Sequence, residues 1–504
     1  METRTIIIGA GPVGLYLAGE IRLGGGDVTV YDKLPEPSGE SRALGFTKRV
    51  AELFDQRGLL SRLGNIRWGQ RGHFGGIGID LEFLDEDHHG VLGLPQSATE
   101  QMLTDWLGEL GVPILRGHEL IGLTQDDDHV EALFDGPDGH HRVRAAHLVG
   151  CDGGHSTVRG LAGITTTGWE STRGMYMADV TGVDPRPRPT GQYVPDANMV
   201  LSVSLGDGYH RVLMHDSSLP PHPDATTLTY TDIATTWQRL TGEDIHHGTA
   251  RWMSAFPNGA ALADRYRSGR VLLAGDAAHD TPPLAGWGVS TGLQDAANLG
   301  WKLAAVTTGA APDSLLDTYH DERHPQGRQL MRNTHAATML YLSGPELDPL
   351  RALVRELVTD QAAAEHLAGQ VSGLGVRYPA DTGTGTDAGT DAGAPDADPV
   401  GLRLDPAREL QHPDGTRTRV AELLHPARGL LIVPDNTATD TATSADAWSG
   451  RVDVVTGTWS GPAAPPAAVL VRPDGHLAWT SHSATDLTEA LGRWFGPART
   501  PTTV

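Results

Sequence analysis

The segment that most constrains this chain lies near its N-terminus, in the sequence TRTIIIGAGPVGLYLAGEIRLGGGDVTVYDK. Its short apolar run, Ile6–Ile8, predicts a buried parallel strand, and Gly9, Gly11 and Gly14 follow that run directly in G-x-G-x-x-G spacing. Apolar residues then recur at helical spacing until three consecutive glycines end the pattern. The sequence therefore predicts a strand, a tight glycine turn and a helix that starts at that turn.

A second strand, DVTVYD, completes this unit and ends in Asp32. Strand, glycine turn, helix and terminal acid in this order are typical of a βαβ unit that binds a dinucleotide. The glycines let the backbone approach a pyrophosphate, the helix N-terminus directs N–H groups toward it, and the acid binds a ribose hydroxyl. The alternative for Asp32 is a solvated acid at a strand end.

A second glycine-rich turn occurs far downstream, in RVLLAGDAAHDTPPLAGWGVSTGLQDAANLGWKLA. Asp276 follows an apolar strand, at the end where α/β folds place ligand contacts. Two prolines, Gly286 and Gly288 then form a stiff turn, and we expect a helix to begin near Thr291. A flavin needs a hydrogen-bond acceptor for its ribityl hydroxyls and positive dipole for its pyrimidine edge. This turn therefore indicates a flavin rather than a nicotinamide as the resident cofactor.

Between these two turns lies CDGGHSTVR, residues 151–159, again after an apolar strand. Asp152, Ser156 and Arg159 are expected to form a network of side chains and backbone that organises the pyrophosphate loop. The alternative is that Ser156 caps a helix and Arg159 lies on that helix's surface. Cys151, the only cysteine, is interpreted as a small buried residue rather than a nucleophile.

The three motifs in this order resemble those of the group A flavoprotein monooxygenases with the para-hydroxybenzoate hydroxylase fold. Within that family the chain is most similar to aromatic polyketide hydroxylases and to rifampicin-type and tetracycline-type monooxygenases. The segments ESRALGFTKR and LPQSATEQML also match, and they carry Arg42 and Gln96. The resemblance implies that FAD contacts Gly9, Gly11, Pro12, Gly14, Asp32, Lys33, Arg42, Gln96, Leu120, Asp152, Asp276, Pro283, Gly286, Gly288, Val289 and Ser290.

The same resemblance implies the reaction. NADPH, or NADH, binds transiently and reduces FAD, O2 adds to give a flavin C4a-hydroperoxide, and one oxygen atom passes to a bulky aromatic polyketide. Baeyer–Villiger insertion, oxidative ring cleavage and inactivation of an antibiotic remain open, because they start from the same intermediate. A flavin-binding scaffold without turnover is the non-enzymatic alternative. No metal site is expected.

Trp287 marks a departure from the family, whose members usually have glutamine at this position. Its indole is expected either to reshape the substrate pocket or to pack under the turn. No catalytic base is assigned, and the candidates for a catalytic role are His73, His215 and Trp287. The residues expected to line the substrate pocket are His73, Phe74, Arg211, Met214, His215, Phe256 and Trp287.

We expect an α/β fold in which a Rossmann-like FAD domain, residues 1–167 and 261–342, carries an inserted antiparallel-sheet substrate domain, residues 168–260. Residues 343–380 are expected to form a helical connection. Residues 381–399 contain no apolar residue larger than alanine and predict a flexible linker. Residues 400–504 resemble a thioredoxin-like domain, which lacks a CxxC motif and serves packing or dimer contact.

Charge limits the partners. The chain of 504 residues has 39 Lys+Arg against 63 Asp+Glu, for a net charge of -24. Such a surface repels phosphate backbones and anionic lipids, so we expect neither a nucleic acid nor a membrane as a partner. No apolar run is long enough to span a bilayer and no signal peptide is evident. A cytoplasmic monomer or homodimer is the expectation.

Overall fold

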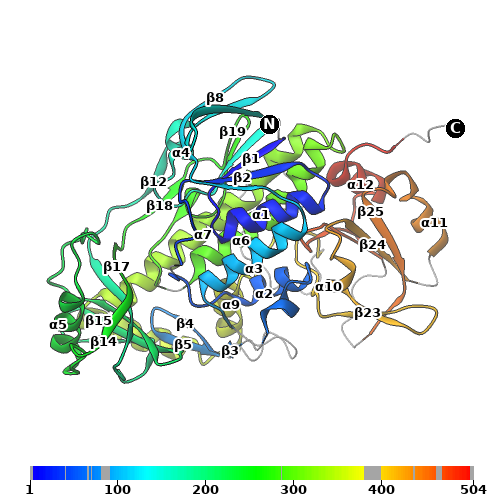
Figure 1. The fold of residues 1–504 in the computed structure, drawn as a ribbon. Helices are drawn as coiled ribbons and strands as arrows, with labels where there is room; N and C mark the ends of the chain where they lie inside the picture. Colours follow the sequence, from blue (N-terminus) through cyan, green and yellow to red (C-terminus); the bar gives the residue numbers. More distant parts are fainter. Residues whose placement is uncertain are drawn as a thin grey trace.

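A computed structural model describes residues 4–39, 41–64, 67–69, 71–80, 91–284, 286–379, 399–434, 438–460 and 468–499. Figure 1 shows a central α/β body, an antiparallel sheet at one end and a C-terminal α/β region at the other. The expected linker, residues 381–399, lies outside the described residues except for Pro399. None of the helices in the described ranges combines the length and the apolar character needed to span a bilayer.

The central body is built on a six-stranded sheet with the order β19-β20-β11-β1-β2-β7. All neighbouring pairs are parallel except β19 and β20. The strands are β1 (Thr5–Ile8), β2 (Val28–Asp32), β7 (Ile114–Arg116), β11 (His147–Gly150), β19 (Arg267–Ser268) and β20 (Val271–Leu273). The predicted first two strands are confirmed, and their near-continuous apolar runs are buried.

Four helices accompany this sheet: α1 (Pro12–Leu23), α3 (Gln96–Glu109), α6 (Trp287–Thr307) and α7 (Asp317–Leu342). Helix α1 lies close to both α3 and α6, because a Cβ on Gly19 would stand 2.0 Å from the Trp106 ring and one on Gly300 would stand 2.3 Å from Glu20 Cβ. Helix α6 begins at Trp287, earlier than the predicted Thr291, because Gly286 caps it in the left-handed region with φ 68°.

Smaller elements surround this body. An antiparallel sheet of β8 (Glu119–Gln125), β9 (Val130–Gly136) and β10 (Gly139–Ala145) precedes β11, and β12 (Thr166–Trp169), β18 (Ala260–Ala263) and β21 (His279–Asp280) form another. The remaining elements of this part are α2 (Lys48–Asp55), η1 (Leu60–Leu63), the pairs β3 (Arg67–Gly69) with β6 (Val91–Gly93) and β4 (Arg71–Phe74) with β5 (Ile77–Asp80), α4 (Thr157–Leu161) and η3 (Gly275–Ala277).

The five-stranded sheet at one end is antiparallel, with the order β14-β15-β16-β13-β17. Its strands are β13 (Gly174–Thr181), β14 (Arg188–Val194), β15 (Asn198–Gly206), β16 (Tyr209–His215) and β17 (Thr249–Pro257). Side chains alternate between its faces. One face packs on α5 (Tyr230–Thr241) around Trp237, and the other, with Met175 and Met177, contacts Leu284 and the end of α7.

The C-terminal region contains a mixed sheet in the order β25-β24-β27-β28, in which only β24 and β25 are parallel. Its elements are β22 (Glu409–Gln411), β23 (Arg417–Arg419), α10 (Val420–Leu423), β24 (Gly429–Val433), α11 (Ala438–Thr443), η6 (Asp446–Trp448), β25 (Val452–Thr456), β26 (Thr458–Trp459), β27 (Val469–Val471), β28 (Leu477–Thr480) and α12 (Leu487–Phe495). The predicted Pro-Asp-Gly turn joins β27 to β28. Trp301 of α6 packs into this region's core beside Trp494 and Phe495.

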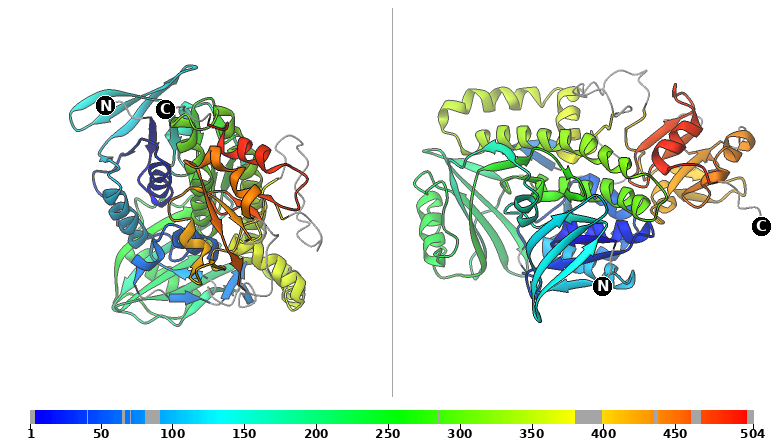
Figure 2. Two further views of the ribbon diagram at one scale, coloured as in Figure 1. Left: turned by 90° about the vertical axis from the view of Figure 1, so that its right-hand side faces the viewer. Right: turned by 90° about the horizontal axis from the view of Figure 1, so that it is seen from above.

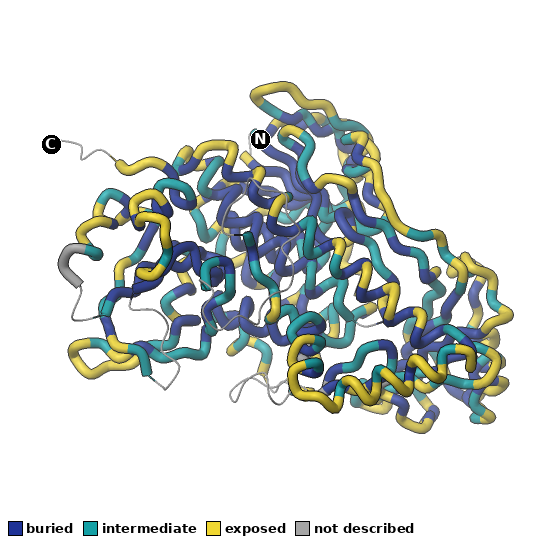
Figure 3. The backbone as a smooth tube through the Cα atoms, turned by 180° about the vertical axis from the view of Figure 1, so that it is seen from behind, coloured by how far each residue is buried: buried dark blue, intermediate teal, exposed yellow. Residues whose placement is uncertain are grey.

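Long helix α7 runs along the molecule and leads through η5 (Pro345–Leu347) into α8 (Asp348–Leu357) and α9 (Gln361–Ser372); η4 (Asp313–Leu316) precedes it (Figure 2). Helix α9 packs on the β4–β5 hairpin, where Ile79 contacts Ala368 and Val371. Buried backbone is concentrated in the central body and the C-terminal sheet, while α8 is largely exposed (Figure 3).

Candidate active site

The three glycines of the first motif, of which Gly9 and Gly11 lie between β1 and α1 and Gly14 lies in the first turn of α1, meet three different requirements. Gly9 has φ 106°, and a Cβ there would stand 2.3 Å from the Cys151 carbonyl oxygen. A Cβ on Gly14 would stand 2.1 Å from the Gly9 oxygen, so the helix could not approach the turn. Gly11 caps α1 without a side-chain hydrogen bond and has no atom within 4 Å of its Cβ position. The space in front of Gly11 and the free N–H groups of α1 suit an anion.

The carboxylate of Asp32 braces this turn at the end of β2. Its Oδ2 accepts a hydrogen bond of 2.7 Å from the Ala10 N–H, and its Oδ1 accepts one of 2.8 Å from the Leu34 N–H. Each oxygen keeps a second lone pair, so the acid can also accept from a ligand hydroxyl. Pro12 occupies the first turn of α1, where its missing N–H costs no hydrogen bond, and Lys33 is exposed beside the acid.

The second glycine turn places Asp276 against the N-terminus of α6. A Cβ on Gly288 would stand 3.8 Å from Asp276 Oδ1, and the helix itself has no side-chain cap at Gly286. Asp276 is an exposed residue. The surrounding protein nevertheless raises the pKa of its carboxyl by desolvation, an effect that His279 and Arg42 partly offset by lowering the pKa. Pro283 is exposed, Val289 packs on the central core, and Ser290 is buried.

A buried triad behind this turn holds its shape. Asp295 of α6 accepts hydrogen bonds from His279 Nε2 at 2.6 Å and from the Gly275 N–H at 3.2 Å, while its other oxygen accepts from Arg323 Nε at 2.7 Å. All three side chains are fully buried. Burial alone would raise the pKa of Asp295, but His279 and Arg323 lower it. The sequence analysis missed Asp295 and Arg323. A charged residue inside the largely apolar helix α6 is a signal for Asp295, whereas Arg323 stands among other charged residues of α7 and has no such signal.

The CDGG motif forms the expected network. Asp152 accepts hydrogen bonds from Ser156 Oγ at 2.5 Å and from the Val158 N–H at 3.0 Å. Ser156 also caps α4 through the Arg159 N–H, so both interpretations of Ser156 hold at once. The Arg159 guanidinium, however, is not merely a surface group, because it donates to the Ala277 carbonyl at 2.9 Å. This bond ties the second motif to the third. Burial raises the pKa of the Cys151 thiol, which therefore stays protonated.

The loop of residues 41–47 closes another side of the site. Gln96 is the first residue of α3, and its backbone N–H donates to the Ala43 carbonyl at 3.0 Å. The Thr47 N–H donates to Ser290 Oγ at 3.1 Å. The Arg42 side chain is exposed, and its carbonyl accepts from Arg211 at 2.8 Å. The loop thus joins α3, the five-stranded sheet and the start of α6.

Arg211 is occupied by protein partners. Its guanidinium donates to both Asp179 oxygens, at 2.7 and 2.9 Å, and to the carbonyls of Ser41 and Arg42. It also lies 5.2 Å from the Trp252 ring centroid. The geometry favours Arg211 as a clamp between sheet and loop over direct substrate contact.

The other sheet candidates divide between the two faces. Met214 is buried on the α5 face, away from the central body, while its neighbour Leu213 lies on the face that contacts Leu284. Phe256 packs against this second face, and His215 shares the strand face of Leu213. His215 Nδ1 bonds the Gly174 carbonyl at 2.7 Å, and its buried Nε2 has no hydrogen-bond partner among the described residues.

His73 and Phe74 belong to the β4–β5 hairpin. His73 Nδ1 lies 2.9 Å from the Tyr341 hydroxyl, and burial lowers the pKa of His73 to about 4. Phe74 stacks on Trp287 with a centroid distance of 5.7 Å. Trp287 therefore packs between this hairpin and α9, where Val371 is a neighbour. Leu120 is buried in the central core on β8.

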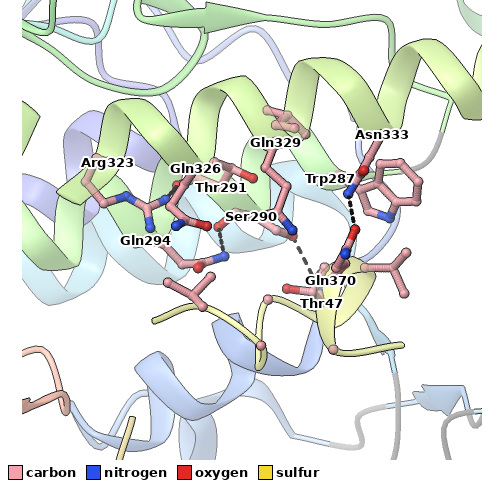
Figure 4. A pocket seen from close by; sticks show the side chains of 16 residues that line it. Thr47, Trp287, Ser290, Thr291, Gln294, Arg323, Gln326, Gln329, Asn333 and Gln370 are labelled. Atoms are coloured by element: carbon pink, nitrogen blue, oxygen red, sulfur yellow. Dashed lines mark hydrogen bonds between the residues drawn. The ribbon is translucent and has the colours of Figure 1, made fainter. Parts of the chain in front are cut away.

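A small polar pocket adjoins the start of α6 (Figure 4). Amide side chains from three helices line it, and Asn333 donates to Gln370 at 3.0 Å and Gln294 to the Ser290 carbonyl at 3.1 Å. Trp287 lies at its edge, so this residue separates the pocket from the hairpin.

Taken together, these residues define a site for a dinucleotide that carries a pyrophosphate and a polyol. Helices α1 and α6 both begin without side-chain caps, which leaves their N–H groups for ligand oxygens. Gly11 leaves room for close approach, and Asp32 and Asp276 supply acceptors for hydroxyls. The residues present therefore fit FAD.

Comparisons with known proteins also indicate FAD as the cofactor. The chain matches the FAD binding domain family over residues 2–334 and the aromatic-ring hydroxylase C-terminal family over residues 398–498. It is 38% identical to the 12-dehydrotetracycline 5-monooxygenase/anhydrotetracycline 6-monooxygenase of Streptomyces rimosus, covering 99% of both chains. It is also 38% identical to the rifampicin monooxygenase of Streptomyces venezuelae, covering 98% of both.

Among solved structures, CabE, an aromatic hydroxylase from angucycline biosynthesis, is 47% identical with a TM-score of 0.91, covering 99% of this chain and 100% of that one. The protein belongs to the FAD-dependent aromatic-ring hydroxylases, as the sequence resemblance predicted. It is a flavin-dependent monooxygenase with a mixed α/β fold.

Proposed function

We propose that this enzyme uses NADPH or NADH and O2 to hydroxylate a bulky aromatic polyketide in natural-product biosynthesis. One observation carries the proposal. The turn that carries Asp276, Leu284 and Gly286, called the flavin turn below, lies against the apolar inner face of the five-stranded sheet, where Met175, Met177 and Leu213 pack with Leu284. Relatives named for tetracycline, rifampicin and angucycline chemistry support a polycyclic substrate.

We propose a domain arrangement on the basis of the sheets and the glycine turn. Residues 1–167 and 261–342 would form a Rossmann-like FAD domain, which the parallel sheet and glycine turn support. Residues 168–260 would cover the substrate, and residues 343–380 would connect the body to the C-terminal part. Residues 400–504 would be thioredoxin-like in fold, supported by the mixed four-stranded sheet with α12. Without a CxxC motif, that domain has no dithiol chemistry.

Bound FAD supplies the redox chemistry, namely acceptance of hydride and activation of O2. The chain's own groups hold and orient it. The N–H groups of α1 would bind the pyrophosphate, Asp32 would bind the ribose, and Asp276 would bind the ribityl chain. The N-terminus of α6 would stabilise negative charge on the bound flavin.

On the substrate side, the inner sheet face excludes water and places the aromatic ring. Phe256 and the Phe74–Trp287 stack would form aromatic walls. His215 Nε2, which is buried and has no hydrogen-bond partner among the described residues, would pair with a substrate hydroxyl. His73, with a pKa of about 4, is neutral near pH 7, so it acts through its hydrogen bond with Tyr341 rather than as a titrating base.

The test is anaerobic mixing of the yellow protein with NADPH, followed by isotopically labelled O2 and a panel of aromatic polyketides. We expect flavin bleaching before O2 is added and one labelled oxygen atom per product, attached to a ring carbon. Labelled oxygen within an enlarged ring would instead identify Baeyer–Villiger insertion. A flavin spectrum that NADPH and NADH leave unchanged would contradict the proposal and favour a scaffold.

A further inference from the structure

The turn between β27 and β28 inserts charged side chains into the central body. Arg472 and Asp474 are 2% and 1% exposed. Arg472 donates to both oxygens of Glu322 on α7, at 2.5 and 3.0 Å. In return, Arg49 of α2 donates to the Asp474 carbonyl at 2.7 Å. The two parts of the chain are therefore joined by buried charges and not only by apolar contact.

The same cluster continues into α6. Glu322 Oε2 accepts from Asn298 Nδ2 at 2.6 Å and from Lys302 Nζ at 2.7 Å. Asp474 Oδ2 accepts from the Trp301 indole at 3.4 Å. Three residues of α6, spaced along one face of the helix, thus depend on carboxylates from α7 and from the C-terminal turn.

Both helices also hold the flavin turn. Glu322 and Arg323 are neighbours on α7: the first faces the C-terminal turn, and the second bonds Asp295, which in turn holds His279 and the Gly275 N–H. Helix α6 begins at Trp287, directly after its N-cap Gly286 in the flavin turn. A shift of α6 along its axis would move its free N–H groups relative to a bound flavin.

Joining two regions through buried charges requires the desolvation of every charged group in the cluster. Buried ion pairs are often no more stable than apolar residues of the same volume, so stability alone does not explain one. Although burial would raise the pKa of Glu322, Arg472 and Lys302 lower it to about 2, which keeps it ionised. The Arg472 guanidinium also lies 4.5 Å from the Trp494 ring centroid and 5.0 Å from that of Tyr378. The directional contacts specify one position for the turn.

We propose that Arg472 and Asp474 are positioning residues for the flavin site: by fixing α6 and α7 against the C-terminal region, they set where the N-terminus of α6 meets the cofactor. The inference deepens the proposed function and rests on it. It gives the C-terminal region a role in flavin binding.

The test compares Arg472→Met with Arg419→Met. Arg419 also joins the C-terminal region to the central body, through an ion pair of 2.7 Å with Asp55, but it lies on β23, and its ion pairs within the described residues go to Asp55 and Glu422 rather than to α6. FAD is removed from each protein and from the wild type, and rebinding is followed by flavin fluorescence, the visible flavin spectrum and thermal unfolding. A wild type that does not rebind FAD would contradict the proposed function itself.

We expect Arg472→Met to weaken FAD binding at least tenfold and to shift the flavin spectrum, while Arg419→Met changes FAD affinity less than twofold. If Arg472→Met fails to fold, Asn298→Leu provides the second variant, because it removes the α6 contact and leaves the Arg472–Glu322 pair in place. It should shift the same spectrum and weaken FAD binding about threefold. Two folded proteins with wild-type FAD affinity and spectrum would overturn the inference.

Discussion

Helices α1 and α6 both follow a glycine N-cap and have no side-chain cap, but their N-termini are built differently. At α1 the turn is mostly local: Gly14 packs on Gly9 and Asp32 braces the turn from the adjacent strand, while Cys151 is the distant residue that packs on Gly9. At α6 the turn depends on distant groups, because Asp295 needs Arg323 of α7 and Ser290 bonds the Thr47 N–H. The comparison teaches that a helix N-terminus can bind an anion through a short motif or through a long-range scaffold.

The largest expected effect is at α6. Asp295→Asn leaves Arg323 and His279 buried without their shared carboxylate, so the free energy of unfolding should fall by about 3–5 kcal/mol. FAD binding should weaken with it, because the Gly275 turn loses its brace. Chemical denaturation with and without FAD measures both quantities. A variant as stable as the wild type would show that the α6 turn is as local as that of α1.

At α1, Gly9→Ala should disrupt the turn itself. A Cβ would overlap the Cys151 oxygen, which costs about 1–3 kcal/mol as overpacking, and φ 106° adds about 1–2 kcal/mol of backbone strain. Gly11→Ala is the matched control, because its Cβ meets no protein atom. It should keep the wild-type Tm and bind FAD less tightly, since the methyl group enters the ligand space. Equal Tm losses in both variants would refute this assignment.

Asp276→Ala removes an acceptor and leaves the α6 scaffold intact, so its effect should fall on the ligand alone. FAD affinity should decrease by about 1.5–3 kcal/mol, the range for hydrogen bonds to a charged group. The measurement is titration of the FAD-free protein with FAD, and Tm without FAD is the control. An unchanged affinity would place the ribityl chain elsewhere.

Asp280 lies where the turn that carries Asp276 approaches the CDGG motif, because its carboxyl is close to Gly154 of that motif. Burial and Asp276 raise the pKa of Asp280 from 3.8 to about 6. Its contribution to stability is therefore greatest below pH 3.8 and is lost as the pH rises through 6. Asp280→Asn should raise Tm at pH 7.5 and change it little at pH 4.5. The same difference at both pH values would show that the carboxyl titrates normally.

The smallest effect is expected at Trp287, the first residue of α6. Its stack with Phe74 contributes about 0.5–1.5 kcal/mol beyond area burial. Trp287→Gln should keep FAD bound, because the turn's backbone supplies those contacts. It should also release more hydrogen peroxide per NADPH consumed in the presence of substrate, since a looser wall admits water. Unchanged coupling would restrict Trp287 to packing against α9.

Much of the fold followed from local patterns. Strand, glycine turn and helix were predicted at α1 because the motif is short and the steric need of Gly14 arises at Gly9, although that of Gly9 comes from Cys151. The start of α6 was predicted too late, since a left-handed Gly286 moves the cap forward. Met214 was predicted to line the substrate pocket but lies on the α5 face, because a period of two gives two faces without saying which one meets the central body.

The sequence by itself determined the three motifs, the cofactor class and the enzyme family, because each motif is a short stretch whose residue types imply one backbone conformation. Tertiary structure decided the rest. Only it brought Asp295 to His279 and Arg323, committed Arg211 to Asp179 and two carbonyls, and set Arg472 against Glu322. Those pairs join residues far apart in the chain, and a buried charge reveals that it needs a partner without revealing which one.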